Sequence, residues 1–141
     1  MSQALCTSFK KELFMSLHNF SAAGGHTFKI ALFTSGVTLD ETTTAYSATG
    51  ETGGTAYVAG GFTLTNVDPS TSGTTAMVTF AANPTWTSAT FTASQALIYN
   101  TSSGNKAVAV LDFGGTQTVS AGDFVVTFPA VTSTTALLRL T

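Results

Sequence analysis

Few side chains in this sequence could act as catalytic bases or nucleophiles. His18 and His26 are its only histidines, and Cys6 is its only cysteine. A nucleophile needs a base within hydrogen-bonding reach and a third group that orients the base. Neither histidine lies in a motif such as G-x-S-x-G, so both are expected to be solvated on the surface. Cys6 lies on the apolar stripe of an expected helix, where cysteine acts as a small hydrophobic residue. We therefore expect no enzymatic activity.

The sequence also lacks motifs that bind metals, phosphates or organic cofactors. It contains no H-E-x-x-H, no paired C-x-x-C and no EF-hand spacing. Isolated loop carboxylates such as Asp40, Glu41 and Asp68 could join a calcium site, but such groups are usually just solvated. None of the Gly-Gly pairs opens a helix that carries a Walker lysine. Asp112 interrupts an apolar strand and is expected to make a structural hydrogen bond. We expect no metal and no cofactor.

The composition points toward contacts with other proteins. Charged residues make up 9% of the 141 residues, against roughly a quarter in an average soluble domain. Threonine supplies about a fifth of the chain, so hydroxyl groups replace charges on the surface. The net charge of −2 argues against binding to nucleic acid. No apolar run is long enough to span a membrane, and Lys10 and Lys11 interrupt any signal-peptide core. We expect synthesis in a cytoplasm without export.

One amphipathic helix is predicted at the N-terminus, over Ala4–Phe20 within the region 1–22. Its apolar residues recur at three- and four-residue spacing. They are Leu5, Phe9, Leu13, Leu17 and Phe20. Phe14 and Met15 fall outside this stripe, one on each flank. Either the apolar face is wide and packs on a sheet edge, or Phe14 or Met15 touches another chain.

Three short apolar runs near the C-terminus form the centre of the predicted fold. They are Ala96–Tyr99, Ala107–Phe113 and Phe124–Phe128, each closed by turn residues, as in consecutive antiparallel strands. Further strands are expected at His26–Phe33, Phe62–Val67, Ala76–Phe80, Ala89–Ala93 and Ala136–Leu140. The pattern predicts one all-β domain over residues 1–141. Its architecture is an antiparallel β-sandwich, either a jelly roll or immunoglobulin-like.

A long segment rich in threonine and glycine, Thr34–Gly61, interrupts the strand pattern. Loops of this length inside a compact domain are usually functional or mobile. We expect residues 34–61 to form a loop or arm that reaches a neighbouring subunit. Its candidate contact residues are Asp40, Glu41 and Tyr46, and Phe33 is expected to extend the outward face of the strand before it.

Several segments carry a family resemblance in their amino-acid sequences and in their order along the chain. They are ALCTSFKKELFMSLHNF, HTFKIALFTSG, SATFTASQALIYN, KAVAVLDFGG and VSAGDFVVTFP. In them the chain resembles small structural proteins of tailed bacteriophages. The resemblance implies a capsid decoration (cement) protein on the virion surface, made in the host cytoplasm. Its partners would be the major capsid protein and other copies of itself, as a homotrimer or another homo-oligomer, with no nucleic acid or membrane involved.

Two other functions stay open at the level of the sequence. The same resemblance also fits a tail or tail-tip component, which could bind a receptor. From another class, a carbohydrate-binding β-sandwich would use exposed aromatic rings as a sugar platform. Trp86, Tyr46 and Tyr57 are the candidates for that platform, although Trp86 is expected to plug the core.

Overall fold

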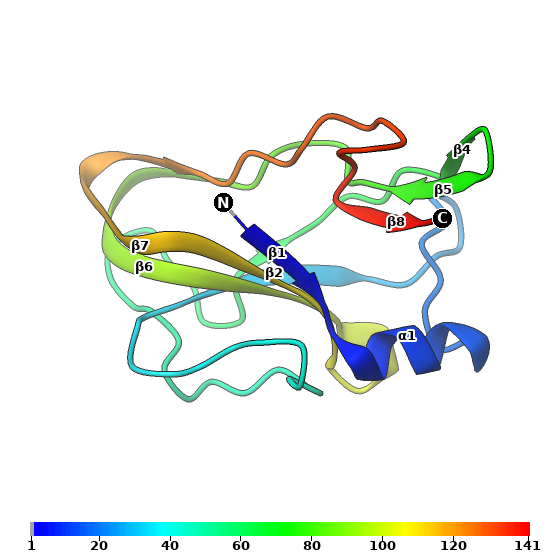
Figure 1. Ribbon diagram of the computed structural model, residues 1–141. Helices are drawn as coiled ribbons and strands as arrows, with labels where there is room; N and C mark the ends of the chain where they lie inside the picture. The colour runs from blue at the N-terminus through cyan, green and yellow to red at the C-terminus, as the bar shows by residue number, and fades with distance from the viewer. Residues whose placement is uncertain (1) are drawn as a thin grey trace.

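The computed structural model describes residues 2–141 as a mostly β protein with two antiparallel sheets (Figure 1). The larger sheet has the order β1 (Ser2–Leu5), β7 (Lys106–Val125), β6 (Thr85–Asn100), β2 (Phe28–Phe33) and β3 (Phe62–Thr63). The smaller has the order β4 (Ser70–Ser72), β5 (Thr75–Val78) and β8 (Leu138–Leu140). The helices in this range are α1 (Thr7–Phe14) and the short 3-10 helix η1 (Thr101–Ser103). The predicted all-β, antiparallel character is therefore confirmed.

The β6–β7 hairpin is the centre of the larger sheet. Its pairing extends from Thr85 opposite Val125 to Asn100 opposite Lys106. The sequence predicted two strands in each of these stretches, separated by turns. The structure instead has two long strands with several register shifts. Bulges of this kind bend a strand without ending it, which explains why residues that favour turns, including Gly114, lie inside β7.

The N-terminal helix is shorter than predicted. Residues Ser2–Leu5 form β1, which pairs with β7 along the sheet edge, from Ser2 opposite Asp112 to Leu5 opposite Ala109. The edge of a sheet presents a row of unpaired backbone N–H and C=O groups. Residues 2–5 form hydrogen bonds with this edge, although their apolar spacing is typical of a helix. The helix ends at Phe14, and Ser16 adopts a left-handed backbone conformation with φ of 58°.

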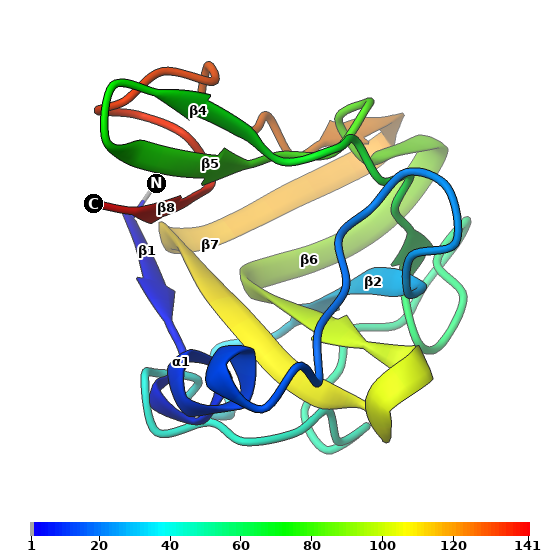
Figure 2. The same cartoon turned by 90° about the vertical axis from the view of Figure 1, so that its right-hand side faces the viewer.

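The core lies where the two sheets and α1 meet. Figures 1 and 2 show the three-stranded sheet on one side of the five-stranded sheet, with α1 at its end. Phe9 of α1, Phe28 of β2 and Leu138 of β8 belong to one buried cluster. Phe20, beyond the helix, stacks on Phe28 with ring centroids 4.4 Å apart. Four of the five residues of the predicted apolar stripe therefore pack in or against the core, although three of the five lie outside the helix.

Residues 34–61 form a long loop that lies on the opposite side of the larger sheet (Figure 1). Backbone bridges join Glu51 to Phe33, Thr55 to Thr90 and Ala45 to Lys106. The amide of Thr52 donates to the carbonyl of Leu32 at 2.9 Å. The loop is therefore attached to this domain along much of its length, and its contact with a neighbouring subunit stays a prediction.

The loop also corrects the expectation for Phe33. This side chain is 1% exposed, because Glu51 bridges its backbone and Tyr46 packs edge-on to its ring at 6.4 Å. Phe33 is a core residue and has no surface with which to contact another chain.

Candidate protein-binding site

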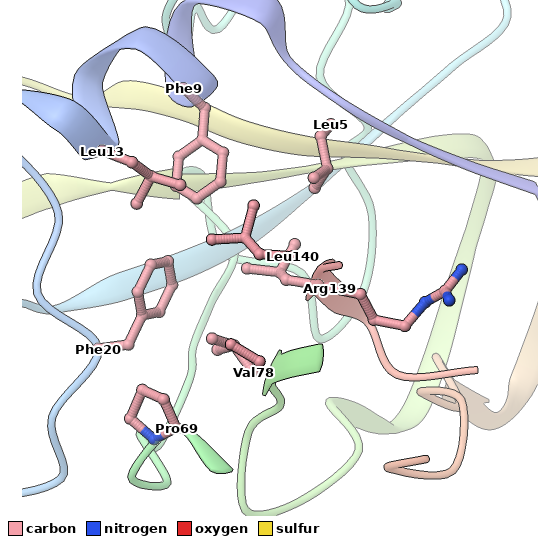
Figure 3. A pocket seen from close by; sticks show the side chains of 10 residues that line it. Leu5, Phe9, Leu13, Phe20, Pro69, Val78, Arg139 and Leu140 are labelled. Atoms are coloured by element: carbon pink, nitrogen blue, oxygen red, sulfur yellow. The ribbon is translucent and has the colours of Figure 1, made fainter. Parts of the chain in front are cut away.

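An apolar pocket of about 200 Å³ opens between α1 and the three-stranded sheet (Figure 3). Its walls come from β1, α1, the segment after α1, and strands β5 and β8. The lining residues are Leu5, Phe9, Leu13, Phe20, Pro69, Ala76, Val78, Leu138, Arg139 and Leu140. The pocket can hold an apolar side chain or ligand, and it offers no acid–base group for a reaction.

Local geometry explains why apolar side chains gather at this pocket. Phe9 and Leu13 are four residues apart, so they lie on the same face of α1. In β8, Leu138 and Leu140 alternate with Arg139, which places the two leucines on the same side of the strand. Arg139 lines the pocket with its stem only. Its guanidinium donates from Nη1 to the carbonyl of Ser133 at 2.9 Å and points away from the cavity in Figure 3.

Two exposed apolar side chains lie at the end of the same helix. Phe14 is 95% exposed and Met15 is 55% exposed. Both are candidate contact residues from the sequence, and their exposure leaves them free to contact another chain. Full burial of a phenylalanine side chain is worth about 1.5–3 kcal/mol, so an almost fully exposed ring on the helix that also lines an apolar pocket is a candidate contact with another chain.

Asp40 and Glu41, two predicted contact residues of the long loop, do not lie at the end of α1 with Phe14 and Met15. Glu41 is exposed, and its carbonyl accepts a hydrogen bond of 2.8 Å from the amide of Thr7, the first residue of α1. Asp40 is half-buried, and hydrogen bonds from the hydroxyl and amide of Thr42 lower the pKa of its carboxyl group. These carboxylates therefore lie near the start of α1, whereas Phe14 lies at its end.

A hydrogen-bonded tyrosine cluster around Glu51 was missed by sequence reasoning. The Glu51 carboxylate accepts hydrogen bonds from the hydroxyls of Tyr46 and Tyr57, both at 2.6 Å, and from the amide of Gly60 at 2.7 Å. Tyr99 stacks on Tyr46 at 4.5 Å and donates to the carbonyl of Gly60 at 2.6 Å. The only signal in the sequence was two tyrosines flanking a glutamate in a loop of small residues.

These contacts argue against a sugar platform. Trp86 is 5% exposed and belongs to the core, as expected for a core plug. Tyr57 stacks on Trp86 at 6.1 Å, and its hydroxyl is bound to Glu51 and to the amide of Leu32. The three aromatic residues proposed for sugar binding are thus used inside the fold.

The prediction that His18 is solvated is wrong. Its side chain is 0% exposed, because α1 ends before residue 18 and the following segment turns back toward the hairpin. Nε2 lies 3.3 Å from Oε1 of Glu12, and Nδ1 lies 3.0 Å from the amide nitrogen of Asn100. Lys106 lies 3.6 Å from the other oxygen of Glu12. Both ring nitrogens are therefore occupied by groups of the chain itself.

His26 joins the same network and is only half-buried. Its Nδ1 lies 2.9 Å from the amide nitrogen of Asn100 and also accepts from the backbone amide of Asn19 at 3.3 Å. Since the Asn100 side chain donates to both histidines, each Nδ1 acts as an acceptor and Nε2 of His18 carries the proton toward Glu12. Asn100 of β6 therefore fastens the segment after α1 to the hairpin through both histidines.

Two other predictions about reactive groups are confirmed. Cys6 is fully buried in the core, and burial, with the nearby carboxylates of Asp40 and Glu12, raises the pKa of its thiol to about 11. Such a thiol is protonated near neutral pH and is a poor nucleophile. Asp112 accepts a hydrogen bond of 2.8 Å from the amide of Gly114, which is the structural bond expected for it.

Fold and site together describe a mostly β, antiparallel protein with an apolar pocket between α1 and the smaller sheet. Within residues 2–141, no three His, Cys, Asp or Glu side chains gather in a way that could hold a metal ion. Neither helix in that range is long and apolar enough to cross a membrane. No family model, no curated protein and no solved structure matches this chain.

Proposed function

We propose that this chain is a virion structural protein of a tailed bacteriophage, acting as a capsid decoration protein with a β-sandwich fold of the jelly-roll or immunoglobulin-like type. The observation that carries the proposal is the apolar pocket lined by α1, together with the exposed Phe14 and Met15 at the end of that helix. A surface of this kind suits contact with other protein chains. The assignment to a tailed phage rests on the resemblance of several sequence segments, in composition and order, to small phage structural proteins.

The proposed mechanism is the clamping of neighbouring capsomers on the outside of the shell. The major capsid protein is the partner, and further copies of this chain form a homotrimer or another homo-oligomer. Many weak contacts at symmetry-related sites add up through multivalency and oppose the pressure of packaged DNA. The low charge of the chain supports this role, because crowded copies repel one another little.

The test uses expanded capsid shells prepared from the encoding phage without this protein. Purified protein is added, bound protein is measured by co-sedimentation, and shell disruption is followed on heating. We expect saturable binding and a higher disruption temperature than for bare shells. An equal amount of heat-unfolded protein is the control, because it has the same composition and no folded site. No binding and no gain in shell stability would contradict the proposal.

The copy number in intact virions distinguishes a shell protein from a tail component. A decoration protein is present at every symmetry-related site of a shell, whereas a tail component is present in few copies. Quantitative gel densitometry against the major capsid protein measures this ratio. A few copies per particle would overturn the capsid role in favour of the tail.

A further inference from the structure

The chain carries both an exposed phenyl ring and an apolar pocket. Phe14, the last residue of α1, projects into solvent. Successive residues of a helix are turned by about 100°, so Phe14 points away from the face that carries Phe9 and Leu13 into the pocket. Phe14 therefore does not fill the pocket of its own chain, although the two features share one helix.

The size and chemistry of the pocket fit a phenylalanine side chain. Its volume of about 200 Å³ exceeds the roughly 150 Å³ of an engineered apolar cavity that binds benzene. Leu140 and Val78 border the pocket and are themselves partly exposed. A ring that enters would cover these side chains as well as itself.

Charges around the ring and around the pocket are complementary. Lys10 is exposed and lies four residues before Phe14, on the same face of α1. Asp68 is exposed and directly precedes Pro69, which lines the pocket. Arg139, the cation of the lining, directs its guanidinium to Ser133 and away from the cavity. A helix that brings its phenyl ring into this pocket brings Lys10 toward the edge of the pocket that carries Asp68.

We propose that the Phe14 side chain of one copy occupies the apolar pocket of a second copy. The contact joins the end of α1 in one chain to the α1–β5–β8 wall of the next, and it closes into a two-fold pair or a small ring. This contact rests on the proposed function in that it specifies how copies of the chain associate. It involves only the surface of this chain and no capsid protein. It is therefore tested without capsid shells.

The experiment measures the mass of the purified protein by sedimentation equilibrium over a range of concentrations. We expect the unmodified chain to associate, and Phe14→Ala to weaken association about 10- to 100-fold. Ala76→Phe should fill the pocket with the chain's own ring and weaken association to a similar extent. Val58→Ala is the matched control, because it also removes exposed apolar surface, in the loop far along the chain, and should leave association unchanged.

Mixing the two variants gives the sharpest outcome. Phe14→Ala keeps the pocket, and Ala76→Phe keeps the free ring, so an equimolar mixture should form one-to-one pairs and associate more strongly than either variant alone. Circular dichroism checks that both variants fold; if Ala76→Phe does not, Leu140→Trp fills the pocket from its exposed rim. A monomeric unmodified chain, unchanged association of Phe14→Ala, or no pairing in the mixture would overturn the proposal. Shell binding by a monomeric chain would leave the proposed function intact.

Discussion

At the scale of single residues, the Glu51 carboxylate is the polar group on which the long loop most depends. It accepts three hydrogen bonds, from Tyr46, Tyr57 and the amide of Gly60. Glu51→Gln replaces one acceptor oxygen with an NH₂ group that faces a donor. Hydrogen bonds to charged groups contribute about 1.5–3 kcal/mol each, so we expect the free energy of unfolding to fall by about 2 kcal/mol.

Urea denaturation measures this change, and Glu41→Gln is the matched control. Glu41 carries an exposed carboxylate, so the same chemical replacement there should change the free energy of unfolding by less than about 0.5 kcal/mol. Equal stability of the two variants would show that the Glu51 cluster does not hold the loop.

The residues that sequence reasoning placed correctly are those with an environment defined by their neighbours along the chain. Cys6 follows two apolar residues and is buried, and Asp112 is followed two residues later by a glycine that supplies its hydrogen-bond donor. His18 and Phe33 were misplaced because distant segments cover them. Asn100 reaches His18 from the hairpin, and the bridge at Glu51 covers Phe33. Neither contact has a signature in local periodicity.

At the scale of elements, the existence of strands was easier to predict than their limits. The turn residues that close the apolar run at Tyr99 include Gly104 and Asn105, and both adopt left-handed conformations, with φ of 64° and 59°. The lengths of β6 and β7 were not predictable, because bulges let a strand continue through residues that usually end one. The pocket could not be predicted from the sequence either, because the residues that line it come mainly from β1, α1, β5 and β8, which are far apart along the chain.

Alanine substitutions at Gly104 and Gly61 test the effects of backbone strain and of steric overlap separately. Gly104 has φ of 64°, and a Cβ added there meets no atom within 4 Å, so Gly104→Ala should cost only the left-handed penalty of about 1–2 kcal/mol. Gly61 has φ of 85°, and an added Cβ would overlap the carbonyl oxygen of Ile30. Gly61→Ala should therefore cost more, on the order of 3 kcal/mol or above.

Thermal denaturation of both variants checks this order. Gly53→Ala is the control, because Gly53 has ordinary backbone torsions and open space around its Cβ position. It should be neutral or slightly stabilising, since alanine narrows the unfolded ensemble. If Gly104→Ala proved more harmful than Gly61→Ala, the turn and not the β2–β3 contact would be the sensitive point.

At the scale of the whole molecule, buried titratable groups limit the pH range of stability on both sides. Burial lowers the pKa of His18 below 6.5; the hydrogen bond and charge of Glu12 oppose this, and His26 and Lys106 add to it. The unfolded chain therefore takes up a proton that the folded chain does not, and stability falls as the pH drops below about 6.5. The tyrosines act in the opposite direction. Burial, assisted by Glu51, raises the pKa of Tyr46 and Tyr57 well above 10, and that of Tyr99 to about 12.

Because these tyrosines keep their protons in the fold after the unfolded chain has lost them, stability should also fall as the pH rises above about 10. We expect a plateau of the unfolding temperature between about pH 7 and 9, with a decline on each side, because the buried Cys6 thiol also keeps its proton in the fold above its ordinary pKa of 9.0. Calorimetry across this range measures the plateau, and absorbance of phenolate reports tyrosine ionisation directly. Tyr99→Phe removes one of the three groups, so its alkaline decline should be shallower than that of the unmodified chain. Appearance of phenolate from all three tyrosines near pH 10, before unfolding, would contradict the burial that the Glu51 cluster requires.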